Sequence, residues 1–512
     1  MITRLLSILT ALAAFGSIAS ANNLHVTNVV LRPITSHSLG IQFDLSWDNS
    51  WRDECNHDAA WVFAKYSLDG GTNWLHATLQ GSGTNPVGYA TGTFPNLEIV
   101  VPSDRKGAFV RPTATERGTL ATTNMLLVWD LAADGVPATA RGRVSVQGLE
   151  MVYIPAGPFY VGDNSSVGNG TGGGRSFAVT YINTPVMTNG AASGAGTIAS
   201  PYTNLTIGIG RPYGITGTFS TNYPNGYNAF YIMKYELSRA RYLAFLNLLT
   251  TNQAATLRNQ QANFQGLNGT IAAAFTNTYP MNWTNVQPWR AVLFGTTSVT
   301  NPFSYSGSQE WFAYLDWAAL RPMTEMEYEK AARGPLLPVD RGYPWGTASR
   351  LLVTRLTNSN TAAEAPLIRG ANLLAGAGYG GTLGVTPPLL RNGASADAAS
   401  DQFQAGASYY GVMDLAGNIA DPCVVSGPAG NSGTVPAAAL AYSGAHGDGL
   451  LNTNGIANAT NWPYQSAVSY GGGTIGKRGG DYGTPSLGCT ISARVTDNYY
   501  TSHGIRAVRT AP

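Results

Sequence analysis

Residues 321–334 constrain the fold more than any other part of the chain, because they read as one complete, sharply bounded helix. Thr324 is placed to cap the first turn, and Glu327 three residues later can reach back to the cap amide, which is the capping-box arrangement. Tyr328 and the alanine pair that follows form one apolar face. Gly334 stands where a left-handed residue commonly ends a helix. The segment therefore predicts a short helix packed against a core.

Two further helices are predicted upstream, each with apolar residues at the i, i+3, i+4, i+7 spacing. Ser238 caps the first helix and Ser308 begins the second. The apolar positions are Tyr242, Phe245, Leu246 and Leu249 in the first helix, and Trp311, Tyr314, Leu315 and Ala318 in the second.

Residues 22–135 are predicted to form an all-β domain. Short β-rich runs alternate with turn signals such as Asp69-Gly70-Gly71, which is the spacing of an immunoglobulin or fibronectin-like sandwich. The predicted strands are Val26 to Leu31, Leu39 to Trp47, Ala60 to Tyr66 and Leu126 to Leu131. Residues 136–147 are expected to be a linker.

A second domain is predicted over residues 148–512. It opens with two strand-like runs around Pro155, and residues 163–228 form an insertion rich in Gly, Thr, Asn and Ser. Residues 230–235 read as a further strand.

The first 21 residues resemble a secretory signal. An apolar run from Leu5 to Ile18 precedes Ala19-Ser20-Ala21, so cleavage is expected before Asn22. The run is too short to span a bilayer, and no later segment is apolar enough to do so. We expect a secreted or cell-surface protein.

The charge composition argues against nucleic-acid binding. The net charge is +2, and no basic stripe is present. Charged residues make up 11% of the chain, against about 25% in typical globular proteins. Weakly charged, Gly/Thr/Asn-rich surfaces suit extracellular proteins that pack against neighbours.

The chain has three cysteines: Cys55, Cys423 and Cys489. An odd number in an exported protein allows one disulfide, with Cys423 and Cys489 as the pair, and one free thiol. The alternative is that all three are small buried residues.

Six segments, in order, resemble the formylglycine-generating enzyme (sulfatase-modifying factor) family. They are 151–162, 230–246, 309–334, 343–346, 411–418 and 478–509. The resemblance implies an α+β domain with a variant of the C-type lectin fold over residues 148–512. The sandwich region lies outside it.

The resemblance also implies an oxidase chemistry that this chain lacks the residues to perform. Oxidases of the family hold copper with two cysteines, five residues apart, after an Arg-Gly-Gly motif, because soft thiolates select Cu(I). Here the motif is Arg478-Gly479-Gly480. Counting forward from it puts the first cysteine position at Thr484 and the second at Cys489, whereas counting back from Arg494 puts the second at Ser486. The first cysteine is missing on either count, so we expect neither copper nor catalytic residues. Arg494 and Arg506 match family arginines and are expected to make structural hydrogen bonds.

A calcium site is implied by the segment 414–421, where the family holds calcium through two side chains and two carbonyls. By position, Asp414 and Asp421 would supply carboxylates, and Gly417 and Ile419 would supply carbonyl oxygens, a donor set that suits Ca²⁺. The glutamate of the family is replaced by the shorter Asp421. The alternative is a turn in which the aspartates bind backbone amides.

The loops of the terminal segment have the composition of a binding surface, with Tyr for contact area and Asn, Ser and Gly for adaptable hydrogen bonds. In the family, the corresponding loops surround the active groove. The candidate ligand-binding residues are Asp481, Tyr482, Asp497, Asn498, Tyr499, Tyr500 and His503. The alternative is a solvated loop pair.

The sequence is compatible with three functions. The first is an exported, non-catalytic surface protein that binds a protein or glycan through residues 481–503. The second is a structural subunit that self-assembles into an extracellular layer or filament. The third is a formylglycine-generating or related oxidase with an altered metal site.

Overall fold

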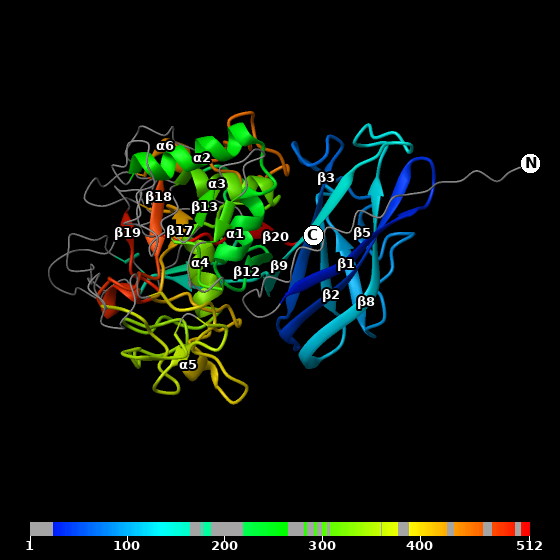
Figure 1. The fold of residues 1–512 in the computed structure, drawn as a ribbon. Coiled ribbons are helices and arrows are strands. Elements are labelled where there is room, and N and C mark those ends of the chain that lie inside the picture. Colours follow the sequence, from blue (N-terminus) through cyan, green and yellow to red (C-terminus); the bar gives the residue numbers. More distant parts are fainter. Residues whose placement is uncertain are drawn as a thin grey trace, which may run out of the picture.

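Antiparallel strands dominate the computed structural model, with helices gathered in one half of the molecule (Figure 1). The described residues are 24–163, 176–177, 179–185, 219–264, 281–283, 291–293, 300–304, 308–359, 361–376, 389–427, 435–463, 474–496 and 503–512. The mixed α+β class is therefore confirmed. The predicted signal, 1–21, and most of the insertion 163–228 lie outside the described residues.

Two facing sheets form the predicted β-region. The first is a three-stranded sheet in the order β1-β2-β8, and the second contains β3, β6, β7 and the short strands β4 and β5. A layer of apolar side chains from both sheets fills the space between them, and we call it the sandwich core; it includes Phe43, Val62 and Leu127. The strand bounds are β1 His25–Pro33, β2 Ser38–Arg52, β3 Asp58–Ser67, β4 Leu75–His76, β5 Gly83–Thr84, β6 Leu97–Val101, β7 Ala108–Pro112 and β8 Glu116–Asp130.

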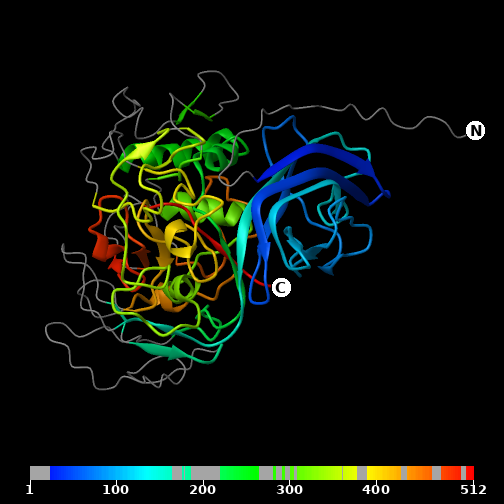
Figure 2. The same ribbon diagram turned by 90° about the horizontal axis from the view of Figure 1, so that it is seen from below.

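The second of these sheets continues into the C-terminal half without a break. Its order is β20-β12-β9-β3-β7-β6-β5, and β9 pairs with β3 from Arg143 to Val152. The predicted linker 136–147 is therefore wrong from Arg143 onward, because those residues are the first half of a long strand. The added strands are β9 Arg143–Ile154, β12 Phe230–Met233 and β20 Val508–Thr510. Figure 2 shows β9 passing from the sandwich into the helical half.

Strand β3 is buried along its whole length because its two faces serve two cores. Ala60 and Val62 pack in the sandwich core. The intervening residues Trp61 and Phe63 pack against the helices. Such a strand has no polar face, as expected for a strand covered on both sides.

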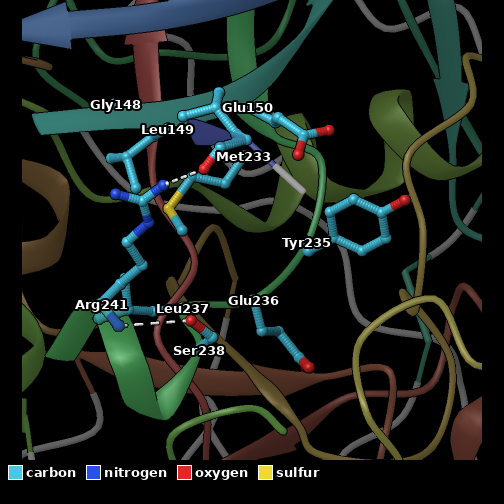
Figure 3. A pocket seen from close by; sticks show the side chains of 10 residues that line it. Gly148, Leu149, Glu150, Met233, Tyr235, Glu236, Leu237, Ser238 and Arg241 are labelled. Carbon is cyan, nitrogen blue, oxygen red and sulfur yellow. Dashed lines mark hydrogen bonds between the residues drawn. The ribbon is translucent and has the colours of Figure 1, made fainter. Parts of the chain in front are cut away.

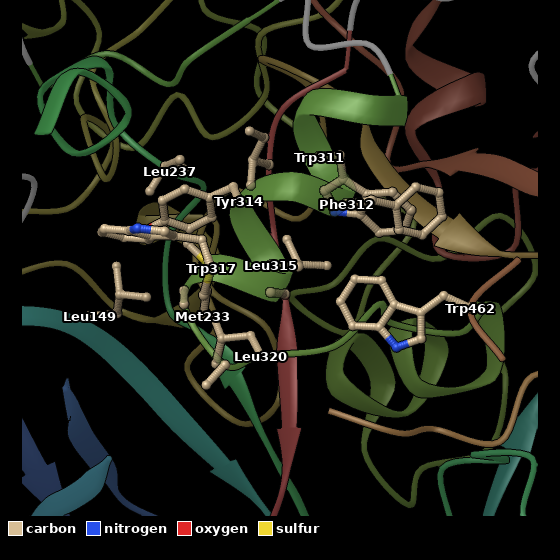
Figure 4. Close-up of a cluster of buried hydrophobic side chains, with 14 of the residues drawn as sticks. Leu149, Met233, Leu237, Trp311, Phe312, Tyr314, Leu315, Trp317, Leu320 and Trp462 are labelled. Atoms are coloured by element: carbon tan, nitrogen blue, oxygen red, sulfur yellow. The ribbon is translucent and has the colours of Figure 1, made fainter. Parts of the chain in front are cut away.

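The helical half is built around α3, whose aromatic residues form the centre of the second core (Figure 4). The predicted helices are confirmed: Ser238 caps α1, and α3 starts at Ser308. Leu249 lies beyond the end of α1. The helices are α1 Arg239–Leu246, α2 Thr251–Phe264, α3 Ser308–Trp317, α4 Glu325–Arg333, α5 Gln402–Ala405 and α6 Ala437–Leu440.

Helix α4 is the helix predicted from residues 321–334. Thr324 and Glu327 form the reciprocal capping box, so that prediction is confirmed. Gly334 has the expected positive φ of 67°, but its ψ of −150° lies outside the left-handed helical region. A side chain at Gly334 would also collide with the Tyr409 ring, so this position requires glycine for two reasons.

Small antiparallel sheets complete this half. The three-stranded sheet β17-β18-β19 carries the Arg-Gly-Gly motif at the end of β18, and a 3₁₀ turn at Ser486–Cys489 follows it. The bounds are β10 Phe159–Val161, β11 Thr180–Ile182, β13 Met281–Trp283, β14 Ala291–Leu293, β15 Leu356–Thr357, β16 Ala365–Pro366, β17 Asp421–Val424, β18 Ile475–Arg478 and β19 Val495–Thr496. Among the described residues, no helix has the length and apolar character needed to cross a membrane.

Candidate functional site

Cys489, the one cysteine at an oxidase position, lies inside a packed apolar cluster with Tyr343, Trp345 and Leu373. Its Sγ lies 4.0 Å from the carbonyl oxygen of Thr484. Burial raises the pKa of the Cys489 thiol, and the nearby Asp481 carboxylate raises it further. A thiol in this setting is held as a neutral donor and not as a thiolate ligand.

The residue at the first oxidase position is engaged elsewhere. The Thr484 hydroxyl donates to the Asp481 carboxylate at 2.7 Å, and the Asp481 amide donates back to that hydroxyl. At Ser486, the alternative second position, the backbone carbonyl oxygen accepts a hydrogen bond from the Tyr343 hydroxyl at 2.8 Å. Both residues thus stabilise the turn that precedes Cys489.

All three cysteines are free thiols, so the disulfide alternative is wrong. Cys423 lies on β17 in a cluster with Tyr328 and Leu415, apart from the cluster that holds Cys489. Cys55 is exposed, so the alternative that every cysteine is buried holds only for the other two.

The predicted ligand-binding residues separate into two groups. Tyr482 is 1% exposed and His503 is 3% exposed, so both belong to the interior. His503 bridges to Ala420, and Asp481 closes a turn by accepting the Gly483 amide at 3.0 Å. The other four predicted residues, Asp497, Asn498, Tyr499 and Tyr500, lie outside the described residues.

The predicted calcium ligands are engaged in other contacts. Asp421 accepts a hydrogen bond from the Arg506 Nε at 2.7 Å, and Asp414 accepts one from the Gly393 amide at 2.7 Å. A guanidinium inside the ligand set repels a divalent cation. The donor set therefore fits calcium poorly, and the turn alternative describes Asp414 better. Ile419 is buried, and Gly417 lies at a positive φ of 72° in the same turn.

Glu236 adds a third carboxyl to this neighbourhood. Its Oε1 lies 4.0 Å from an Arg506 nitrogen, and both of its oxygens are buried without a hydrogen-bond partner. Burial raises the pKa of the Glu236, Asp414 and Asp421 carboxyls. The Arg506 guanidinium opposes this increase at all three carboxyls. Among the described residues, no group of three or more His, Cys, Asp or Glu side chains is arranged to hold a metal ion.

Arg494 and Arg506 make the structural hydrogen bonds that were expected of them. Arg494 binds both oxygens of Glu325, at 2.8 and 2.6 Å, and Arg506 also donates to the carbonyl oxygen of Met233 at 2.8 Å. The charged residues of α4 are paired in the same way: Glu327 binds Arg321, and Glu329 binds Arg478. Each pair is almost fully buried.

A second buried charge cluster lies where the sandwich meets the helical half, and sequence reasoning did not find it. Lys234 follows β12, and its Nζ lies 3.6 Å from the Asp58 Oδ2 and 3.4 Å from the Glu150 Oε2. The side chains of the lysine, the aspartate and the glutamate are at most 4% exposed. We call these residues the lysine triad.

Asp58 is held rigidly within the lysine triad. Its Oδ1 accepts hydrogen bonds from the Ser50 hydroxyl at 2.9 Å and the Trp51 amide at 3.2 Å, and its Oδ2 accepts one from the Trp47 indole at 3.0 Å. Burial raises the pKa of the Asp58 carboxyl, although Lys234 and these donors oppose the increase. The Lys234 Nζ also lies 4.7 Å from the centre of the Trp51 ring.

A small open pocket lies beside the triad, between the start of the sandwich and α1. Arg241 closes one side of it by donating to the carbonyl oxygen of Leu24 at 2.8 Å. Figure 3 shows the Glu150 carboxylate turned away from Arg241, on the side where Tyr235 lies. Glu150 therefore belongs both to the pocket lining and, through its carboxylate, to the lysine triad.

Two sequence signals point to the triad in retrospect. Asp58 opens a strand that is otherwise almost wholly apolar, and Lys234 ends another apolar run, Phe230–Met233. A charge at the end of a buried strand requires a buried partner. The sequence alone does not bring the two strands together, because their pairing runs through β9.

The chain matches no protein-family model, and a search of curated proteins returned no significant match.

Proposed function

We propose that this chain is an exported, non-catalytic interaction protein. Its C-terminal half, with the α+β fold of the formylglycine-generating enzymes, would bind a protein or glycan through the segment 481–503. The sandwich region would be a second, tightly joined part of the same framework.

The packing of Cys489 carries the non-catalytic part of this proposal. A copper oxidase of this kind needs two accessible thiolates, whereas Cys489 is a buried neutral thiol. A Cβ on Gly480 would approach the Cys489 Sγ to 2.7 Å. Gly480 of the Arg-Gly-Gly motif therefore packs directly against the Cys489 thiol.

The proposed ligand binding rests on the residues around Cys489. Gly483 and Pro485 are exposed on the turn that covers Cys489. Tyr499 and Tyr500 follow β19 in the sequence, and tyrosines of this kind supply contact area at low cost in side-chain entropy. The buried Tyr482 and His503 would support the surface from within and would not touch the ligand.

Ligand retention by the full chain tests the proposal. We expect the immobilised protein to retain a ligand from panels of glycans and extracellular proteins, and the double variant Tyr499→Ala/Tyr500→Ala to lose it. Tyr409→Ala is the matched control, because Tyr409 is exposed elsewhere on the described surface. Equal retention by the double variant and the control would reject the assigned surface.

A second candidate function, self-assembly into a layer or filament, is favoured by exposed apolar side chains on the helical half. They are Leu336, Leu337, Val339, Leu351, Leu352, Leu367 and Ile368. Exposed side chains of this kind supply apolar area for association. Light scattering and electron microscopy of the purified chain distinguish the two functions, since a persistent monomer excludes assembly.

A further inference from the structure

We propose that the lysine triad forms an intramolecular isopeptide bond, in which the Nζ of Lys234 is joined to the side-chain carbonyl carbon of Asp58 and Glu150 transfers the protons. The bond would tie the sandwich to the helical half covalently. It is a modification site separate from the proposed ligand surface, and it does not depend on that function.

The three reacting groups are already in place. The Lys234 Nζ lies 3.6 Å from Oδ2 of Asp58, so the amine is adjacent to the carboxyl group whose carbon it would attack. Glu150 lies slightly nearer, with its Oε2 3.4 Å from the same nitrogen. A lysine amine becomes a nucleophile only after it loses a proton, so a carboxylate at this distance has a direct role.

The remaining contacts of Asp58 suit the transition state of amide formation. Attack at its carbonyl carbon places negative charge on Oδ1, which already accepts hydrogen bonds from the Ser50 hydroxyl and the Trp51 amide. Fixed donors aimed at a developing oxyanion are the usual source of such stabilisation. Oδ2, on the side of Lys234, is the oxygen that leaves.

The reaction balances without an oxidant or a co-reactant. Two of the three ammonium protons of Lys234 pass by way of Glu150 to Oδ2, the C–Oδ2 bond breaks, and the new C–N bond forms. An ammonium and a carboxylate thus become one amide and one water. The chain loses the mass of one water molecule and one charge of each sign.

Burial favours the forward reaction. The side chain of Asp58 is 0% exposed and that of Lys234 is 4% exposed, and Trp47 and Trp51 cover the pair. Exclusion of bulk water protects the amide from hydrolysis and strengthens the electrostatic contacts. Burial also disfavours both charged groups, so their conversion into a neutral amide removes a desolvation penalty.

The bond would link positions that the backbone sheet joins only through β9. Asp58 begins β3 and Lys234 follows β12, and both strands pair with β9. A covalent link here closes a chain loop over residues 58–234. Such a loop lowers the entropy of the unfolded chain in the same way as a disulfide, and suits an exported protein whose cysteines are all free.

Mass spectrometry of the full chain, purified and then fully denatured, tests the proposal directly. We expect an intact mass lower by one water than the mass calculated for the processed chain. Asp69-Gly70, Asp134-Gly135 and Asp448-Gly449 can also lose water as cyclic imides, so the position must be mapped. Trypsin does not cut after an acylated lysine, and the expected product joins residues 53–65 to a peptide ending at Arg239.

Three variants separate the roles. Lys234→Arg and Glu150→Gln should retain the full calculated mass, and Asp58→Asn should lose one ammonia in place of one water. Bond formation in Glu150→Gln at the wild-type rate would overturn the role of Glu150. A wild-type chain that keeps its full mass and yields a free Lys234 peptide after prolonged incubation would overturn the bond itself, whether or not the variants fold.

Discussion

Strand β3 and helix α4 are both buried along their entire length, yet they reach that state by opposite means. Eight of the ten β3 residues carry no charge, and they supply apolar contacts to two cores. Five of the nine α4 residues are charged, and each of the three glutamates binds an arginine outside the helix: Arg321 just before it, and Arg478 and Arg494 far along the chain. The strand is buried because it is apolar. The helix is buried because its charges are paired.

This difference determines where each half of the molecule is vulnerable. Removing apolar volume from the sandwich core costs a transfer free energy and leaves a cavity. Removing one partner of a buried ion pair leaves an uncompensated charge in a low-dielectric interior. The stability of the helical half should therefore depend on keeping its buried ion pairs intact, whereas the stability of the sandwich core should depend on apolar volume.

The largest expected effect comes from the pair at the start of α4. Arg494→Ala should lower the free energy of unfolding by about 3–5 kcal/mol, because Glu325 is left buried and unpaired. Urea denaturation measures the loss. The paired replacement Arg494→Met with Glu325→Leu is the matched control and should recover most of it. Equal losses in the single and paired variants would contradict the idea that pairing buries this helix.

The corresponding change in the sandwich is Leu127→Ala, on β8 opposite β3. We expect a loss of about 2–5 kcal/mol from the lost apolar contacts and the cavity. This loss should not vary with pH.

The ion pair at the start of α4 should, in contrast, depend on pH. Arg494 and Arg478 hold the pKa of Glu325 below its usual value against the effect of burial. The stabilisation from that pair is present above the unfolded pKa and is lost in acid, so the Arg494→Ala penalty should shrink below pH 4.

Much of this contrast could be predicted from the sequence, but only at the local level. The capping box of α4 and the apolar faces of α1 and α3 depend on neighbouring residues, and each prediction is confirmed. The strands β2 and β3 were found for the same reason. The predicted linker failed because a strand's partner, here β3 for β9, is not a local property.

The candidate sites were less predictable for the same physical reason. Tyr482 and His503 have the composition of a binding loop, but tertiary packing buries both. Asp421 matches a calcium position, but Arg506 reaches it from a segment 85 residues away in sequence. The lysine triad needs three segments to meet, and no spacing along the chain indicates it.

Two of the buried histidines, His57 beside the sandwich and His503 in the helical half, give a smaller, pH-dependent effect. Burial lowers the pKa of His57 and of His503 from 6.5 to about 3; Arg111 contributes at His57 and Lys477 at His503. A folded pKa below the unfolded value means that stability is full above pH 6.5 and is lost as the pH falls toward 3. At pH 5 each histidine should cost about 2 kcal/mol.

Urea denaturation at pH 7 and pH 5 measures this loss. Burial also lowers the pKa of His76 and His446, so His57→Gln and His503→Gln should each remove only the contribution of that one histidine, about 2 kcal/mol at pH 5. A pH dependence unchanged in either variant would show that the corresponding histidine is protonated in the folded state.

Calcium should have the smallest effect. Because Arg506 already neutralises Asp421, adding calcium or a chelator should leave the melting temperature unchanged. Arg506→Met provides the informative comparison, since it removes the competing cation. A calcium-dependent increase in the melting temperature of the wild-type chain would show that calcium displaces Arg506 from Asp421.

Copper binding tests the non-catalytic interpretation most directly. The anaerobically purified chain should be titrated with Cu(I) against a competing chelator, and then incubated with a cysteine-containing sulfatase peptide. We predict no tight Cu(I) binding and no change in peptide mass, because the Cys489 thiol is buried and neutral. One equivalent of tightly held Cu(I) that is lost in Cys489→Ser, or conversion of the peptide cysteine, would contradict the account.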